Sequence, residues 1–125
     1  ISSTYKIELL YAPDDLIDSM LWCDLAVSTS GLTKYELAAS GTPSVLVSID
    51  SFHERINQPF AKKGSSYSLG FEFTKEHLAG NVEYLLENQQ KREAMADIGR
   101  SLVDGSGAER IFREIEEVMN AEKTN

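Results

Sequence analysis

The segment from Ser30 to Pro43 constrains the fold of this chain more than any other. It lies between two short apolar runs, 25–27 and 45–47, and consists of a loop of small residues, a helical pattern and a turn. Gly41 is typical of the residue that follows a helix, and Pro43 soon after it prevents the helix from continuing. This order of strand, tight loop, helix and strand predicts a βαβ unit with parallel strands and a right-handed crossover.

Apolar periodicity extends this unit in both directions to a βαβαβαβ order. Residues 6–11 alternate, with Ile7, Leu9 and Tyr11 on one side, which is a strand pattern. The expected strands are 6–11, 25–28, 45–49 and 66–69, and the expected helices are one entered at 13–15, then 33–40, 56–63, 75–102 with a break near 88–91, and 108–121. Residues 50–55 are expected to form a polar loop, with Pro59 in the first turn of the next helix. The sequence therefore predicts an α/β fold, a Rossmann-like parallel sheet with helices on both faces.

Size and charge limit the class of protein. The chain has 125 residues, of which 42% are hydrophobic, so we expect one α/β domain over 1–121 and a frayed polar tail over 122–125. A net charge of -8 argues against nucleic-acid binding, which needs a basic face. The single cysteine, Cys23, is expected to be buried. Because no disulfide framework, signal peptide or membrane-spanning run is visible, the sequence favours a cytoplasmic protein.

The loop at Ser30 and Gly31 is the first candidate for chemistry. A small-residue loop before a helix leaves backbone N–H groups uncovered, and these groups and the helix dipole favour an anion such as a phosphate. Glu36, just inside the helix, could then face a sugar hydroxyl. The alternative is an ordinary capping box between Thr33 and Glu36. A single carboxylate could not fill both roles completely.

The polar segment 50–58 is the second candidate. Arg55 has the planar guanidinium that matches phosphate oxygens, although a solvated loop is the plainer interpretation. His53 could donate a proton or contact a sugar, but the sequence shows no group that would orient its ring. No cluster of residues has metal-ligand spacing and no serine lies in a nucleophile elbow, so no metal or cofactor is predicted.

Several motifs in order resemble the nucleotide-sugar half of GT-B proteins. The resemblance is to MurG-type glycosyltransferases, and still more to the nucleotide-sugar hydrolases of nonulosonic-acid pathways, the PseG and SpsG type. The matching motifs are Ser28-Thr29-Ser30-Gly31, Thr33-x-x-Glu36, Gly41-Thr42-Pro43, Asn57-Gln58 and Asp104-Gly105-x-Gly107-Ala108-Glu109-Arg110-Ile111. They span most of the chain.

That resemblance implies a ligand and roles for particular residues. A UDP-sugar or related nucleotide sugar would place its diphosphate on the loop formed by Ser30, Gly31, Leu32 and Thr33. Glu36 would bind the ribose hydroxyls, Asn57 and Gln58 would contact phosphate or sugar, and Arg55 would assist as a phosphate partner.

The resemblance also implies that these residues form only part of an enzyme. The families carry an N-terminal domain with catalytic residues, and their C-terminal domain has strands before the one expected at residue 6. We therefore expect the chain to be a binding half, incomplete at its N-terminus, of a hydrolase or transferase in cell-surface polysaccharide or nonulosonic-acid biosynthesis. The partner would be that domain in cis or a separate chain. The alternatives are a glycosyltransferase subunit that needs a separate acceptor-binding chain, and a non-catalytic structural α/β domain.

Overall fold

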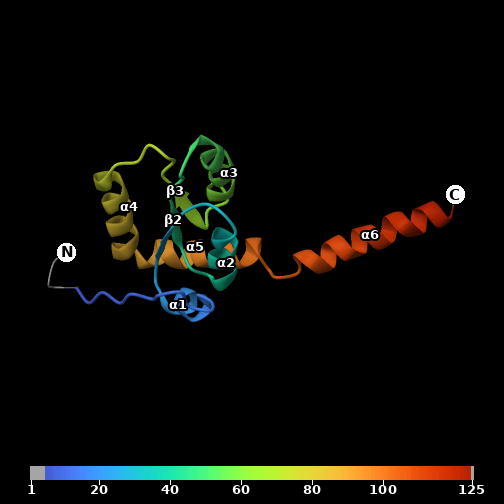
Figure 1. The fold of residues 1–125 in the computed structure, drawn as a ribbon, viewed down its shortest axis with the longest axis horizontal. Coiled ribbons are helices and arrows are strands. Elements are labelled where there is room, and N and C mark those ends of the chain that lie inside the picture. Colours follow the sequence, from blue (N-terminus) through green and yellow to red (C-terminus); the bar gives the residue numbers. More distant parts are fainter. Residues whose placement is uncertain (1–4, 125) are drawn as a thin grey trace.

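A computed structural model describes residues 5–124 and contains a parallel sheet at its centre (Figure 1). Its strands, in the spatial order β1-β2-β3, are β1 (Ala26–Ser28), β2 (Ser44–Leu46) and β3 (Ser66–Ser68). Both neighbouring pairs are parallel, with Val27 opposite Val45 and Val45 opposite Tyr67. The predicted parallel α/β architecture is confirmed.

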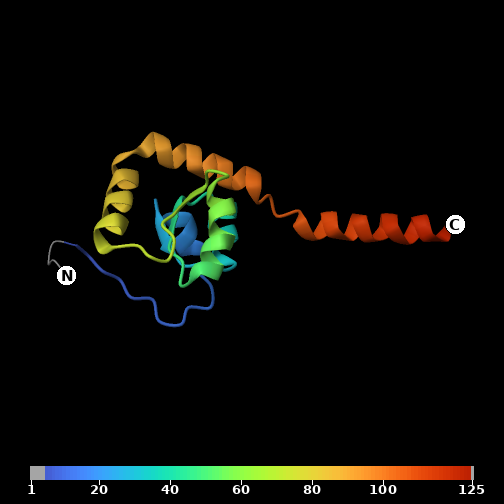
Figure 2. The same ribbon diagram turned by 90° about the horizontal axis from the view of Figure 1, so that it is seen from above.

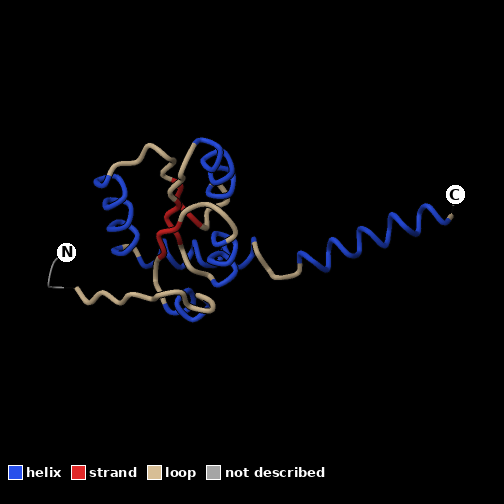
Figure 3. Tube along the Cα trace, in the orientation of Figure 1, coloured by secondary structure: helices blue, strands red, loops and turns tan. Residues whose placement is uncertain are grey.

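Helices cover both faces of this sheet. The crossovers from β1 to β2 and from β2 to β3 contain α2 (Thr33–Ser40) and α3 (Ser51–Ala61), which lie on one side of the sheet. Figure 2 shows α4 (Lys75–Glu87) on the opposite side. α5 (Gln89–Leu102) runs from α4 to α2 and packs against both. α1 (Ile17–Trp22) precedes the sheet, and α6 (Gly107–Lys123) projects away from the body (Figure 3).

The core lies on both faces of the central strand. Val45 and Leu46 point to opposite faces, and both are 0% exposed. Val45 forms an apolar cluster with Leu85 of α4 and Met95 of α5. This cluster is extended by partly buried residues of the strands and of α4, namely Leu25, Tyr67, Leu69, Leu78 and Val82. The central position of β2 explains why its sequence reads as a continuous apolar run.

Local signals correctly located several helix ends. Gly41 ends α2 in the left-handed conformation, with φ of 72°. The break expected near 88–91 is found at Asn88, whose side-chain oxygen accepts a hydrogen bond from the Lys91 N–H at 3.0 Å. The last helix covers the predicted range and continues through Lys123.

The strand predicted over 6–11 is wrong. This segment is not part of the sheet, and Leu9 and Tyr11 are 87% and 92% exposed. Alternation shows that a strand could bury one face, but burial also requires a neighbouring strand or layer, and none covers these side chains within the part of the chain described. Consequently the sheet has three strands among residues 5–124, and four were expected. The helix expected to enter at 13–15 begins at Ile17.

The polar loop predicted over 50–55 is also wrong. α3 begins at Ser51, because the Asp50 side chain accepts a hydrogen bond from the His53 N–H and caps the helix. Pro59 therefore lies inside α3 and not in its first turn. Its missing N–H costs one helical hydrogen bond near the exposed C-terminal end of α3.

Two further observations concern Cys23 and membranes. Cys23, the residue at which α1 ends, is partly exposed and not buried as expected. Partial burial nevertheless raises the pKa of its thiol. Among the described residues, no helix has the length and apolar character needed to cross a membrane.

Candidate functional site

The loops that follow the three strands meet at one edge of the sheet. Hydrogen bonds continue beyond the strand ends, because the Val47 N–H donates to the Ser28 carbonyl at 2.9 Å and the Ser48 N–H donates to the Gly70 carbonyl at 2.9 Å. Parallel strands bring their carboxyl ends to the same edge, and ligands of open α/β sheets bind there. This edge therefore brings together the loop before α2, the start of α3 and the loop after β3.

The loop before α2 is open and its helix start is uncapped. Gly31 has φ of 123°, a region that favours glycine, and a Cβ at this position would have no described heavy atom within 4 Å. Leu32 is the N-cap residue, and no side-chain hydrogen bond caps α2 within the described chain. The Ser30 hydroxyl is buried and has no partner among residues 5–124. Backbone N–H groups of this first turn thus remain available to a ligand.

The capping box considered from the sequence does not form. Thr33 is the first residue of the helix and not its cap, and the N–H groups of Tyr35 and Glu36 donate to the Leu32 carbonyl. The Glu36 side chain is exposed and makes no hydrogen bond to Thr33 in the described structure. The carboxylate of Glu36 is therefore free of the competing structural role.

Lys34 is an unexpected buried residue of the same turn. It is 1% exposed, and its Nζ donates to Asn57 Oδ1 at 3.2 Å. The ammonium lies 5.2 Å from the ring centroid of Tyr35 and 5.8 Å from that of Phe60. Burial lowers the pKa of Lys34, because the charged form loses hydration. Sequence reasoning missed this residue, since lysine is almost always exposed.

Asn57 is a buried residue of α3, and its side chain contacts the other parts of the site. It is 0% exposed, and its Nδ2 donates to the Ser48 hydroxyl at 3.0 Å while its Oδ1 accepts from Lys34. Asn57 therefore connects the first turn of α2 with the segment that follows β2. Had residues 51–61 been predicted as one helix, the burial of Asn57 could have been inferred, because Phe60 lies one turn after it on the same face.

The other polar residues of α3 remain near the surface. Gln58 Nε2 donates to Glu54 Oε1 at 2.9 Å, and Glu54 packs so closely on Gly70 that an added Cβ there would lie 2.6 Å from Oε1. Arg55 is exposed, with its guanidinium 5.9 Å from the ring centroid of Phe52. The approach of Glu54 to Gly70 places this part of α3 against the loop after β3.

His53 has the orienting partner that the sequence did not reveal. Its Nδ1 lies 2.7 Å from Asp50 Oδ1, and the same oxygen accepts the His53 backbone N–H at 2.9 Å. These hydrogen bonds, the backbone one first, lower the pKa of Asp50. The pair occupies the N-terminus of α3, beside the other loops of the edge.

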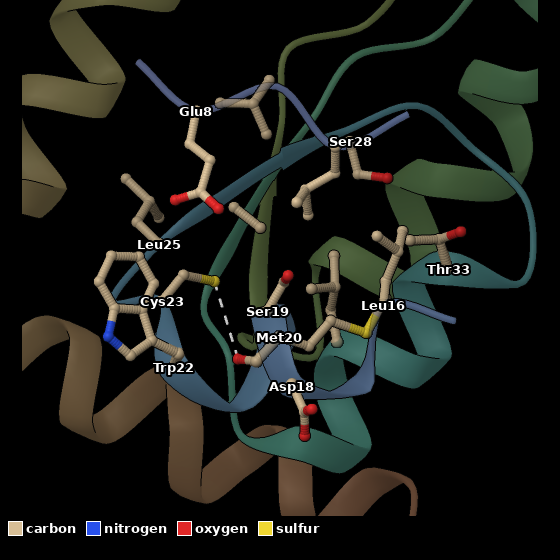
Figure 4. A pocket seen from close by; sticks show the side chains of 14 residues that line it. Glu8, Leu16, Asp18, Ser19, Met20, Trp22, Cys23, Leu25, Ser28 and Thr33 are labelled. Atoms are coloured by element: carbon tan, nitrogen blue, oxygen red, sulfur yellow. Dashed lines mark hydrogen bonds between the residues drawn. The ribbon is translucent and has the colours of Figure 1, made fainter. Parts of the chain in front are cut away.

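Two cavities flank α2, and they separate two of the candidate residues. Figure 4 shows a cavity of about 830 Å³ with Ser28 and Thr33 on one side and Trp22 and Cys23 on the other. Most of its walls are apolar and its charged residues are acidic, which does not suit a diphosphate. Glu36 lines a different cavity of about 790 Å³, between α2 and residues 13–21. The structure thus brings Thr33 and Glu36 onto the same helix but not into the same cavity.

Among the described residues, no group of three histidine, cysteine, aspartate or glutamate side chains is placed to hold a metal ion. The chemistry of the edge is instead that of an uncapped helix start, a buried lysine and an exposed arginine.

Comparison with known proteins shows a similarity to a curated transferase. No family model matches the chain. Over an alignment of 130 positions it is 27% identical to the UDP-N-acetylglucosamine–N-acetylmuramyl-(pentapeptide) pyrophosphoryl-undecaprenol N-acetylglucosamine transferase of Haemophilus ducreyi. The match covers 94% of this chain and 36% of that enzyme, so the chain spans about a third of the length of its relative. The similarity supports a glycosyltransferase-like domain.

Proposed function

We propose that this chain binds the nucleotide diphosphate of a nucleotide sugar, with a UDP-sugar as the preferred ligand. The observation that carries the proposal is the similarity, over nearly the whole chain, to an enzyme whose name specifies UDP-N-acetylglucosamine as a substrate. The open loop at the carboxyl edge supports it independently. Fold similarity alone would not, because unrelated functions share this architecture.

The diphosphate would bind at the start of α2. Gly31 leaves space for a close approach, and the uncapped first turn, with Leu32 as its N-cap, offers N–H groups and the positive end of the helix dipole. The hydroxyls of Ser30 and Thr33 would add hydrogen bonds. Arg55 would approach the phosphates from α3, where its side chain is exposed.

Glu36 would bind the ribose hydroxyls. Its carboxylate is exposed and is released from any capping role, so it can accept hydrogen bonds from a diol. Gln58 would contact phosphate or sugar from the exposed face of α3. Asn57 would serve the same site from the interior, because both ends of its amide are engaged with Lys34 and Ser48.

In the full protein, the reaction would be transfer or hydrolysis at the anomeric or phosphate bond of the nucleotide sugar. The catalytic groups would come from an N-terminal domain of the GT-B type, in the same chain or in a partner. Binding energy from the diphosphate would hold the reacting bond in position for that domain. Cell-surface polysaccharide or nonulosonic-acid biosynthesis is the process that we propose for it.

Titration with nucleotides tests the proposal directly. UDP, GDP and CMP are added separately to the isotope-labelled chain at low salt, and amide NMR shifts are recorded. We expect shifts confined to 28–36 and 50–58 for one nucleotide, and a weaker affinity in Glu36→Ala. Glu83→Ala, which removes an exposed carboxylate from α4, is the matched control. Unchanged affinity in Glu36→Ala would remove the ribose assignment, and no shifts at millimolar nucleotide would refute binding by this chain.

A second candidate function is a glycosyltransferase subunit that acts with a separate acceptor-binding chain. The observation in its favour is the apolar stripe of α6, which lies on a helix that projects from the body (Figure 1). Its members are 52–63% exposed and are Ile111, Phe112, Ile115, Val118 and Met119. A clean monomer in light scattering, with no acceptor-binding chain associated with it in the native complex, would count against this alternative.

A non-catalytic structural domain is the remaining alternative. It predicts no affinity for any nucleotide and a loop before α2 that side chains block. The open space around Gly31 favours the binding function over this alternative.

A further inference from the structure

Within residues 5–124, no carboxylate forms an ion pair with the buried ammonium of Lys34. The described ion pairs join other residues, and the hydrogen-bond partner of Nζ among residues 5–124 is the neutral amide of Asn57 at 3.2 Å. The faces of the Tyr35 and Phe60 rings stabilise the cation in part. An ammonium has three N–H donors, so this environment leaves both charge and hydrogen-bonding capacity unsatisfied.

The position of Lys34 in its helix adds to this electrostatic cost. Lys34 is the second residue of α2, and the N-terminus of a helix already carries the positive end of the dipole. A side chain in a helix also leans toward the N-terminus. A cation at this end is disfavoured, and burial strengthens the effect because water no longer screens the charge. An anion bound at the loop would relieve the unfavourable electrostatics.

Asn57 is held in the orientation that serves Lys34. Its Nδ2 donates to the Ser48 hydroxyl, which leaves Oδ1 to accept from Nζ. Ser48 is fixed in turn, because its N–H donates to the Gly70 carbonyl. The ammonium is therefore attached, through two buried side chains, to the loops that follow β2 and β3.

We propose that Lys34 is the buried cation that gives this edge its preference for an anionic ligand, its charge being neutralised by the diphosphate bound at the loop before α2. This inference rests on the proposed function and adds a residue that the motifs did not indicate. The polar but uncharged Ser30 hydroxyl, buried in the same loop without a partner in the described chain, gives a second group that a bound anion would satisfy. Lys34 thus contributes to affinity through the negative charge of the ligand and not through the base or the sugar.

The first test replaces Lys34 by methionine and compares charged with uncharged ligands. Calorimetric titrations of UDP, uridine and inorganic pyrophosphate are made with wild type, Lys34→Met and Lys63→Met. Lys63→Met is the matched control, because it removes the same charge from an exposed site. We expect affinity for UDP and pyrophosphate to fall about tenfold in Lys34→Met, the size of one partly screened charge interaction, with affinity for uridine unchanged. The control should resemble wild type for all three ligands.

A second variant keeps the lysine and supplies the missing negative charge. In Asn57→Asp the carboxylate lies beside Nζ, and the Ser48 hydroxyl, which accepts from Asn57 Nδ2 in the wild type, can turn to donate to it, so the size of the buried side chain is preserved. If the free charge of Lys34 matters, this variant also loses about tenfold in affinity for UDP and pyrophosphate but not for uridine. A purely structural role for Lys34 predicts no such loss, because Asn57→Asp leaves the lysine and its contacts in place. This arm also decides the question if Lys34→Met does not fold.

The outcomes separate the two proposals. If wild type binds UDP and both variants bind it equally well, the role of Lys34 is overturned and the proposed function stands. Suppose that pyrophosphate binding depends on Lys34 but UDP binds no more tightly than pyrophosphate. The role of Lys34 then stands and the nucleotide assignment fails. If wild type binds neither UDP nor pyrophosphate, both are refuted.

Discussion

The contact between α2 and α5 predicts opposite effects for the same substitution at two glycines. At Gly99, in α5, an added Cβ would lie 2.8 Å from the Ala38 carbonyl oxygen and 3.1 Å from the Ala38 Cα. At Gly80, in α4, an added Cβ would have no described heavy atom within 4 Å. Both positions are inside helices, so alanine improves helix propensity equally at both.

The expected magnitudes follow from these distances. Gly80→Ala should raise the free energy of unfolding by about 0.5–1 kcal/mol, which is the propensity gain alone. Gly99→Ala has the same gain, but its methyl group meets backbone, which cannot rotate away. Overpacking of this kind costs about 1–3 kcal/mol, so we expect a net destabilisation of about 1–2 kcal/mol. Because the propensity gain is common to both variants, their free energies of unfolding should differ by the overpacking cost, about 1–3 kcal/mol.

Urea unfolding monitored by circular dichroism measures this difference. The midpoint should move to higher urea in Gly80→Ala and to lower urea in Gly99→Ala, with the slope unchanged in both if the folded state stays compact. Thermal melting should agree, at about 4 °C per kcal/mol for a chain of this size. If Gly99→Ala proved as stable as Gly80→Ala, the close approach of α5 to α2 would be refuted.

Three further predictions concern helix ends and the projecting helix. Thr74→Ala removes the hydroxyl that accepts the His77 N–H at 3.1 Å and should lower the free energy of unfolding by about 1 kcal/mol, measured by urea unfolding. Hydrogen bonds from Arg110, followed by the Ser106 N–H, lower the pKa of Asp104 to about 2 from its ordinary 3.8. The stabilisation that Asp104 gives to the start of α6 is therefore present above about pH 4 and lost as the pH falls through about 2. Arg110→Gln should raise this pKa in a carboxyl-carbon NMR titration. Removal of α6 should leave the melting temperature of the body unchanged, because every residue of that helix is exposed; a fall of several degrees would contradict the observed separation.

Sequence patterns predicted the elements whose signals are local. Gly41 and Asn88 correctly mark helix ends, because each residue satisfies backbone groups of its own helix. The strand expected over 6–11 failed because alternation describes a strand but not the neighbour that would pair with it. Asp50 is a favourable N-cap residue, but the polar residues that follow it led to the prediction of a loop over 50–55. Expectations that needed only adjacent residues therefore succeeded more often than those that needed a partner.

The candidate site was predicted in part for the same reason. The open loop at Gly31 could be inferred, because a loop of small residues between a strand and a helix is a local feature. The burial of Lys34 and Asn57 could not, because it depends on how α3 packs against α2. Lysine and asparagine are usually exposed, so residue type predicted the opposite. Whether the loop binds a diphosphate stays a prediction.

The charge of Lys34 distinguishes this edge from the rest of the interior. Buried serines occur on the sheet as well, and the hydroxyls of Ser65, Ser66 and Ser68 have no partner in the described chain. A neutral hydroxyl without a partner costs about 1–3 kcal/mol to bury, but an ammonium without a counter-charge costs far more. An apolar side chain of similar length would fill the space between α2 and α3 more favourably. Because positions that break local rules tend to be functional or strained, the buried charge of Lys34 agrees with the anionic ligand that we propose for this edge.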